Sequence, residues 1–210
     1  MKLVGFILVF IPLTLFSQEK LKPKYVLGIS LAPEINFLWV DKKNSQQGQS
    51  RPGWSGSLNL KYPLNKVISM RSALGYGFKR FNYNYSYLIG YYQRTKEISF
   101  SEVELPVLIQ LDLKDQISFF ATGLELVYCF KNFSKNSMND AYGISEELPD
   151  TKYKAIFNIT YVFSFGYNIK FPKRNSLSLE PMAKVYIRDH LITHTRLWNI
   201  GLKSTYYFGK

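Results

Sequence analysis

The two histidines of the chain are the residues best suited to chemistry, and both lie near its C-terminal end. His190 follows Asp189 directly, beside Arg188, and His194 lies four residues further along. A histidine next to a carboxylate can act as a general base, and a pair of histidines can bind a metal ion. However, the segment is expected to be a loop rather than a helix, and no Gly-Xaa-Ser-Xaa-Gly or other nucleophile motif accompanies it. We therefore expect no enzyme, no metal site and no cofactor, and a small hydrolase that uses Asp189 and His190 stays the alternative.

A run of tyrosines between residues 82 and 97 is a second candidate site. Exposed tyrosine side chains provide rigid, amphipathic contact area for a partner. In the other interpretation these tyrosines simply extend the neighbouring strands. With the histidines, the candidate binding residues in loops are Tyr85, Tyr87, Tyr91, Tyr92, His190 and His194.

The elements that position these residues are strands. In the segment 101–112 every odd residue from Val103 to Leu111 is aliphatic, and most even residues are polar. A period of two indicates an extended strand with one apolar face. Alternation of this kind predicts eight strands, at residues 25–40, 54–64, 68–81, 101–112, 117–130, 157–169, 177–188 and 198–208.

The connections between these strands are alternately long and short, which is typical of an outer-membrane barrel with long extracellular loops and short periplasmic turns. Aromatic residues fall at both strand ends, as two interfacial girdles require: Trp39, Trp54 and Trp198 at the long-loop end, and Tyr25, Tyr62, Tyr206 and Phe208 at the other. The pattern predicts an all-β fold, an eight-stranded antiparallel transmembrane β-barrel with up-and-down topology.

Charged residues indicate which face of the strands points inward. They share the non-aromatic face, and mixed charges are costly in lipid but can pair within a narrow lumen. The predicted ion-pair network of the lumen consists of Glu34, Lys61, Arg71, Lys79, Glu102, Glu104, Glu125, Glu180, Lys184, Arg188 and Lys203. Because side chains fill a barrel of eight strands, a narrow passive pore is a lesser alternative. A soluble, periplasmic, lipocalin-like ligand-binding barrel, with the two faces reversed, is the structural alternative.

The N-terminus has the layout of a secretory signal peptide. Lys2 precedes an apolar run from Leu3 to Phe16, and the small residue Ser17 follows. The run is shorter than the roughly 20 residues of a spanning helix. We predict a signal peptide at residues 1–17, removed on export, and a barrel domain at residues 18–210. The single cysteine, Cys129, excludes an intramolecular disulfide.

The net charge of +12 arises from basic residues that are scattered along the chain. Nucleic-acid binding favours basic residues clustered on one face, so we expect no nucleic-acid partner. Contact with anionic glycolipid head groups explains the charge better. The expected partners are therefore outer-membrane lipid and anionic glycolipid, the barrel-insertion machinery during biogenesis, and a protein bound by the extracellular loops.

The segment Val103-Glu104-Leu105-Pro106-Val107-Leu108-Ile109 resembles the Glu-Ile/Leu-Pro-Leu-Leu strand of small outer-membrane barrel proteins of Bacteroidota, often called PorT-like. The leader end at residues 16–19 and the C-terminal residues 206–210 are similar to that family too. One departure is that the aromatic residue expected at the C-terminus is Phe208, with two residues after it.

This family is functionally mixed, so the resemblance implies an outer-membrane location and the barrel fold but no activity. We expect a structural or interaction protein that acts as an accessory to secretion or envelope assembly. Its function would reside in the loops at residues 41–53, 82–97, 131–155 and 189–197.

Overall fold

The computed structural model describes residues 25–40, 46–86, 93–113, 117–139, 145–153, 155–172, 175–187 and 195–208. They form the strands β1 (Val26–Val40), β2 (Gln46–Pro63), β3 (Ile68–Ser86), β4 (Gln93–Asp112), β5 (Ser118–Asn139), β6 (Ser145–Tyr153), β7 (Ile156–Lys170), β8 (Ser176–Tyr186) and β9 (Thr195–Phe208). Within these ranges no helix is long and apolar enough to cross a membrane. The predicted signal peptide at residues 1–17 lies outside them.

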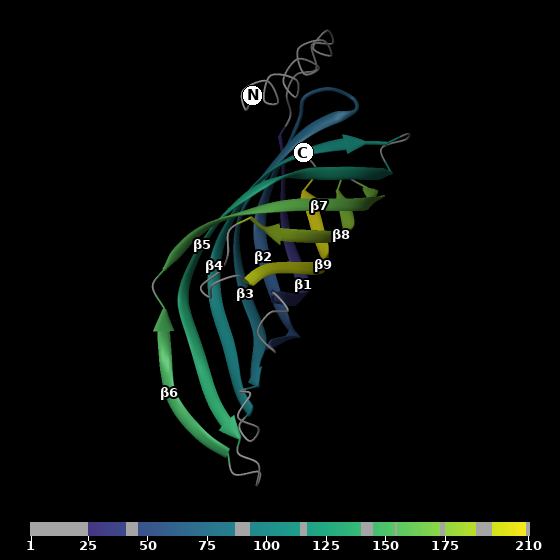
Figure 1. Ribbon diagram of the computed structural model, residues 1–210. Helices are drawn as coiled ribbons and strands as arrows, with labels where there is room; N and C mark the ends of the chain where they lie inside the picture. Colours follow the sequence, from purple (N-terminus) through teal and green to yellow (C-terminus); the bar gives the residue numbers. More distant parts are fainter. Residues whose placement is uncertain are drawn as a thin grey trace, which may run out of the picture.

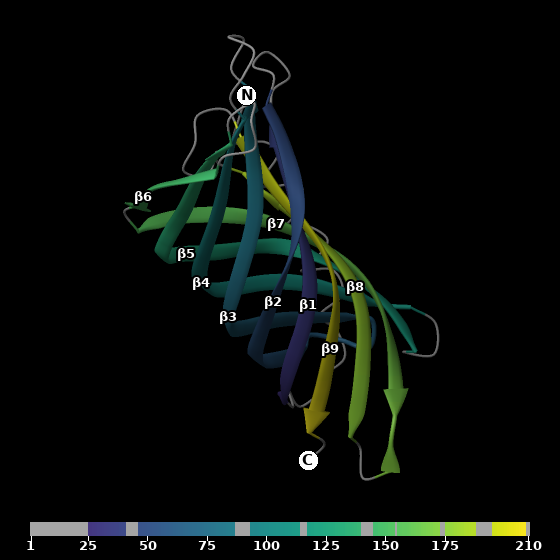
Figure 2. The same cartoon turned by 90° about the horizontal axis from the view of Figure 1, so that it is seen from below.

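Eight of these strands close into a barrel (Figures 1 and 2). The sheet order is β4-β3-β2-β1-β9-β8-β7-β5, and pairing between β4 and β5 joins its two ends. All pairs are antiparallel, and the first and last strands meet along the register Leu27–Phe208 to Val40–Thr195. The predicted eight-stranded antiparallel barrel is therefore confirmed. Closure satisfies the backbone hydrogen bonds of every barrel strand and leaves the barrel without a free edge.

Alternation along each strand puts the apolar face outside. On β1, Leu27, Ile29 and Leu31 are 49–59% exposed, whereas Ala32 and Glu34 are almost completely buried. The same alternation runs along β4, where Leu105 and Val107 face outward. Large apolar side chains thus cover the exterior, and polar and charged side chains fill the interior. This is the reverse of the lipocalin-like arrangement.

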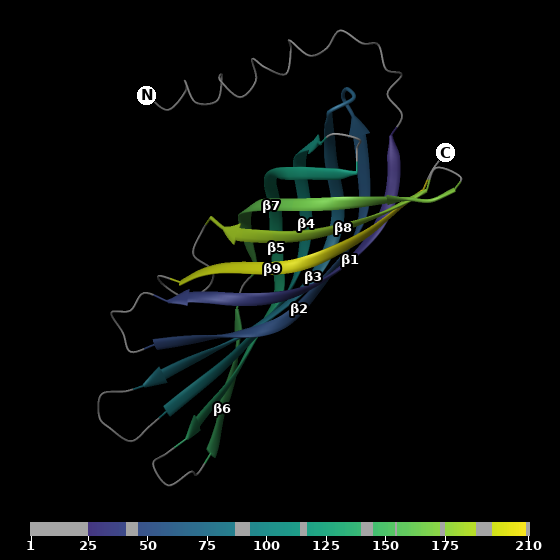
Figure 3. The same ribbon diagram turned by 90° about the vertical axis from the view of Figure 1, so that its right-hand side faces the viewer.

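On one side of the molecule the sheet continues past the barrel as a curved extension, here called the wall (Figure 3). It consists of the ends of β2, β3, β4 and β5 together with β6, at residues 46–53, 79–86, 93–100, 131–139 and 145–153. Pairing continues through this region, from Ser50–Phe81 to Gln46–Tyr85 and from Ser99–Phe133 to Gln93–Asn139. In the described part of the chain β6 pairs with β5 alone.

The wall corrects the predicted loop boundaries. Most of the loops predicted at 41–53, 82–97 and 131–155 is strand, and the last of them is mainly the β5–β6 hairpin. Backbone hydrogen bonds hold these extensions together whatever their side chains are. The apolar alternation that marks the barrel strands weakens there. The strands predicted from this alternation were therefore too short. Of the loop predicted at 189–197, residues 189–194 lie outside the described residues and 195–197 begin β9.

Candidate functional site

The lumen contains two groups of buried charges, and the simpler one is a pair that joins β3 to β8. The two guanidinium nitrogens of Arg71 donate to the two carboxylate oxygens of Glu180, at 3.0 and 2.7 Å. Both side chains are almost fully buried. Arg71 also donates to Gln110 and lies 5.4 Å from the centre of the Phe119 ring. This bidentate geometry is the strongest form of a carboxylate–guanidinium contact.

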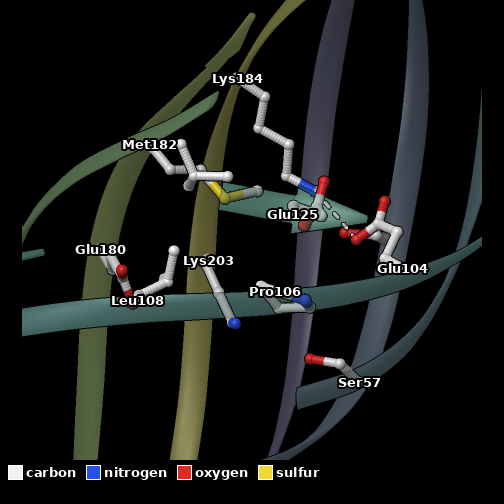
Figure 4. A pocket seen from close by; sticks show the side chains of 11 residues that line it. Ser57, Glu104, Pro106, Leu108, Glu125, Glu180, Met182, Lys184 and Lys203 are labelled. Atoms are coloured by element: carbon white, nitrogen blue, oxygen red, sulfur yellow. Dashed lines mark hydrogen bonds and ion pairs between the residues drawn. The ribbon is translucent and has the colours of Figure 1, made fainter. Parts of the chain in front are cut away.

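The second group, here called the central cluster, contains two lysines and four glutamates: Lys79, Lys184, Glu34, Glu102, Glu104 and Glu125. Lys79 is paired with Glu34 and lies 3.2 Å from Glu102 and 3.1 Å from Glu104. Lys184 lies 2.8 Å from Glu104 and 3.2 Å from Glu125 (Figure 4). All six residues are at most 4% exposed. Each ammonium group is therefore shared among several carboxylates.

Formal charges do not balance in the central cluster, because four carboxylates face two ammonium groups. Oε1 of Glu104 and Oε1 of Glu125 lie at ion-pair distance from a lysine, yet neither atom has a hydrogen-bond partner within the described strands. An uncompensated buried charge is costly. Neutral hydrogen-bond donors offset part of this cost at other carboxylate oxygens.

Those neutral donors are residues that the sequence analysis did not single out. Ser55 and Asn199 donate to Glu34 at 2.7 and 3.0 Å. The hydroxyl group of Tyr186 donates to both oxygens of Glu102, at 3.0 and 2.9 Å. Their inward positions follow from the period of two along β2, β9 and β8. Which glutamate each would reach depends on the pairing of distant strands, which no local pattern reveals.

The remaining predicted charges, Lys61 and Lys203, lie closer to the short turns than the central cluster does. Lys61 pairs with Asp112 at 3.3 Å, and Lys203 donates to Asn59 at 2.9 Å. Asp112 is a further charged residue of the lumen that the predicted network lacked, although it continues the polar face of β4. Of the predicted network, only Arg188 lies outside the described residues.

The loop candidates are not brought together with this network in the described structure. Tyr87, Tyr91, Tyr92, Asp189, His190 and His194 lie outside the described residues. Tyr85 lies on β3, where its backbone pairs with Gln46 and Arg94, but its side chain is outside the description. Among the described side chains, no group of three or more His, Cys, Asp or Glu could hold a metal ion.

An apolar cluster fills the lumen beside the central cluster, and the wall segments of β3 and β4 contribute Phe81, Ile98 and Phe100 to it. It contains Leu38, Phe81, Ile98, Phe100, Val127, Cys129, Tyr186 and Leu197. The rings of Phe81 and Phe100 pack edge to face with centroids 6.0 Å apart. Beside the central cluster there remains a cavity of about 20 Å³, room for about one water molecule. Side chains therefore fill the middle of the barrel, and this arrangement gives no support to a pore.

Glycines on the inner face make room for these large side chains. A Cβ atom at Gly77 would lie 2.7 Å from Oε1 of Glu104. One at Gly166 would lie 2.1 Å from the Phe119 ring, and one at Gly201 would lie 2.8 Å from Cγ of Glu34. The close approach of the charged groups thus depends on the absence of side chains on neighbouring strands.

A protein-family model agrees with this geometry. Residues 16–187 match the model of a family described as "Outer membrane protein beta-barrel domain". A search of curated proteins gave no match. Among solved structures, the chain is similar to Ail of Yersinia pestis, in complex with the heparin analogue sucrose octasulfate, with 12% identity and a TM-score of 0.46 over 88% of this chain and 99% of that one.

Two other solved structures are similar to the chain as well. Neisserial surface protein A is 10% identical, with a TM-score of 0.43 over 85% of this chain and 95% of that one. The N-terminal β-barrel domain of Pseudomonas aeruginosa OprF is 9% identical, with a TM-score of 0.35 over 85% of this chain and 97% of that one. The family match covers most of the chain, and the closed barrel with its apolar exterior fits it. The chain therefore belongs to the outer membrane protein beta-barrel domain family and is located in the outer membrane.

Proposed function

We propose that the barrel is a non-enzymatic membrane anchor and that the wall is the functional part, which binds a partner at the cell surface. The observation that carries this proposal is the continuation of four paired barrel strands, joined by β6, past the apolar belt of the barrel. A protein that needed only a membrane anchor would have no use for this extension.

The upper limit of the apolar belt is visible on neighbouring strands. The ring centroids of Trp54 and Tyr76 are 5.7 Å apart, and those of Tyr76 and Phe130 are 6.2 Å apart. A row of aromatic rings therefore crosses the sheet. Aromatic side chains mark the membrane interface in such barrels. Beyond the row, β5 continues from Phe130 to Asn139, which is roughly 30 Å of strand at about 3.3 Å per residue.

Past this row most of the exposed side chains on the described strands are polar, whereas Phe81, Ile98 and Phe100 are buried. On β2 the residues Gln49, Ser50 and Arg51 are exposed, and on β5 Lys135 is exposed. Arg80 and Glu97 form an ion pair between β3 and β4 with both side chains partly exposed. A polar, hydrogen-bonded sheet that stands clear of lipid provides a rigid surface for a partner, more precise than a free loop.

The finer assignments rest on this arrangement and on the sequence. The Val103–Ile109 segment lies on β4 and supports membership of the PorT-like proteins of Bacteroidota, with insertion by the barrel-insertion machinery. The exposed Arg51, close to the aromatic row, supports contact with anionic glycolipid head groups. The filled lumen supports a structural or interaction role, as an accessory to envelope assembly or secretion, over transport.

Trimming the wall tests this proposal. Residues 132–153 would be replaced by an Asn-Gly turn, which joins antiparallel strands. We expect the trimmed chain to remain in the outer membrane and to keep a boiling-dependent mobility shift, because the barrel pairing of β5 with β4 and β7 is intact.

Binding would be measured by a photo-crosslinking residue placed at the partly exposed Glu97 on β4, whose β5 neighbour Lys135 is removed by trimming, with the lipid-facing Leu31 as the control position in living cells. A discrete adduct at position 97 that is absent at position 31 and lost in the trimmed chain is expected. Equal labelling at the two positions, or an adduct that survives trimming, would contradict the wall as the binding surface.

A further inference from the structure

In the described part of the chain, the lumen forms a cavity of about 490 Å³ at the end opposite the wall, here called the vestibule. Six of the residues that line it are Lys61, Asp112, Asn168, Lys170, Phe171 and Tyr207. They come from the ends of β2, β4, β7 and β9 and from the residue that follows β7. The volume falls in the range of small-molecule binding sites, roughly 300–1,000 Å³.

The vestibule is a closed-ended cup. Beyond it lie the Arg71–Glu180 pair and Gln110, which are almost fully buried, and then the central cluster with its water-sized cavity. A molecule that enters from the short-turn end therefore meets a floor of side chains and does not pass through. By the general arrangement of outer-membrane barrels this end faces the periplasm.

Positively charged side chains outnumber negatively charged ones among the described residues that line the vestibule. The carboxylate of Asp112 is already engaged, since it accepts from Lys61 at 3.3 Å, from Ser69 at 3.2 Å and from Gln110. Lys170, on the inward-facing side of β7, is exposed. Among the described residues that line the vestibule, two ammonium groups thus face one carboxylate whose oxygens are occupied.

The rest of the lining offers both polar and apolar contacts. Asn168 carries a side-chain amide, whereas Phe171 and Tyr207 contribute aromatic rings. Sites for small ligands typically combine apolar walls with a few placed polar groups. This lining therefore suits a ligand with an anionic end and an apolar body better than a simple inorganic ion.

We propose that the vestibule binds a small organic anion, a phosphate or carboxylate carried on an apolar or aromatic group. Lys61 and Lys170 would donate charge-assisted hydrogen bonds to its anionic oxygens. Such an anion has two sources at this place, the head group of a phospholipid of the inner leaflet or a soluble periplasmic metabolite. The inference is independent of the wall, which lies at the opposite end of the barrel.

Calorimetric titration of the folded, full-length barrel with phenyl phosphate tests the site, with phenol as the neutral counterpart. Lys170→Gln is the main variant because its exposed side chain has no part in the core. The matched control is Lys135→Gln, an exposed lysine on the wall. We expect saturable binding with one site per chain, no binding of phenol, and about tenfold weaker binding in Lys170→Gln.

Lys61→Gln is the second variant and should weaken binding by a similar factor, while Lys135→Gln should bind as the unaltered chain does. Absence of saturable binding, or the same loss in Lys135→Gln as in Lys170→Gln, would overturn the proposal. The titration would be done in nanodiscs of phosphatidylcholine alone and of phosphatidylcholine with phosphatidylglycerol. Weaker apparent binding in the second kind supports the lipid head group as the ligand, and equal binding supports the soluble source.

Discussion

The Arg71–Glu180 pair and the central cluster lie in the same lumen, but their charges are arranged differently. The pair is one to one, and its two hydrogen bonds match the planar groups of both side chains. In the central cluster, Lys79 and Lys184 each contact at least three of four carboxylates. In the first arrangement each charge has one counter-charge, whereas in the second each ammonium group is shared by several carboxylates.

This difference separates two ways of holding buried charge in a barrel. In a matched pair, removal of either partner leaves the other without compensation. In a shared cluster with excess carboxylate, removal of a lysine is costly, but removal of one carboxylate relieves repulsion. The four predictions below compare the free energy of unfolding of variants, measured by urea titration in detergent micelles and monitored by tryptophan fluorescence.

The largest loss is expected for Lys79→Met. The substitution keeps most of the side-chain volume but removes the cation that three glutamates share, and it leaves their charge buried. We expect a loss of about 4 kcal/mol, near the middle of the range for a broken buried pair. The exposed Lys135→Met is the control and should change stability by less than about 0.5 kcal/mol. A loss of similar size in both variants would rule out the cluster as the cause.

Glu180→Gln is expected to cost about 3 kcal/mol, because it leaves the guanidinium group of Arg71 buried without its counter-charge. The amide still fits the site and can accept one hydrogen bond, so the loss should be smaller than for Lys79→Met. Glu97→Gln provides the control, since its partner Arg80 is partly exposed and surface pairs contribute little. An equal loss of unfolding free energy in Glu180→Gln and Glu97→Gln would mean that burial does not increase the contribution of the Arg71–Glu180 pair to stability.

Gly166→Ala is expected to cost about 2 kcal/mol through overpacking. The new methyl group would collide with the Phe119 ring, which packs beside Arg71. Gly56→Ala is the matched control on the outer face, where a Cβ atom would meet only ordinary contacts at 3.5 Å or more. If the two alanine variants were equally stable, the inner face would have more room than the contacts indicate.

The smallest effect, less than about 1 kcal/mol, is expected for Glu102→Gln. The amide removes one excess negative charge and still accepts from the hydroxyl group of Tyr186. Combined with Lys79→Met it should recover part of the loss caused by that variant. A cost of Glu102→Gln as large as that of Glu180→Gln would show that the two groups of charges do not differ in the way proposed.

Strand identity and facing were predictable because both depend on local alternation. The apolar residues of 101–112 and of 25–40 recur with a period of two, so each strand specifies its own lipid side and its own inner side. The charges on the inner side then indicated a polar lumen, and the number of strands indicated closure. The apolar exterior and the closed sheet of the structure follow from these features.

The alternation of apolar residues did not predict the wall, and the reason is physical. The ends of β2 to β5 and all of β6 are held by backbone hydrogen bonds to their neighbours, and those bonds leave no mark in the order of side chains. The buried residues Tyr186 and Ser55 and the partly buried Asp112 were missed as partners because the role of each depends on the group of a distant residue that it meets.

By itself, the sequence determined that the chain forms a closed sheet of eight strands with an apolar exterior and a charged interior, since periodicity is a property of each strand alone. Only the tertiary structure decided which charges meet. Glu34 reaches Asn199 on the neighbouring strand as well as Lys79 and Lys184, and Arg71 reaches Glu180, more than a hundred positions away in the chain. These contacts depend on strand register and barrel closure, which place residues from all parts of the chain within a few ångströms of one another.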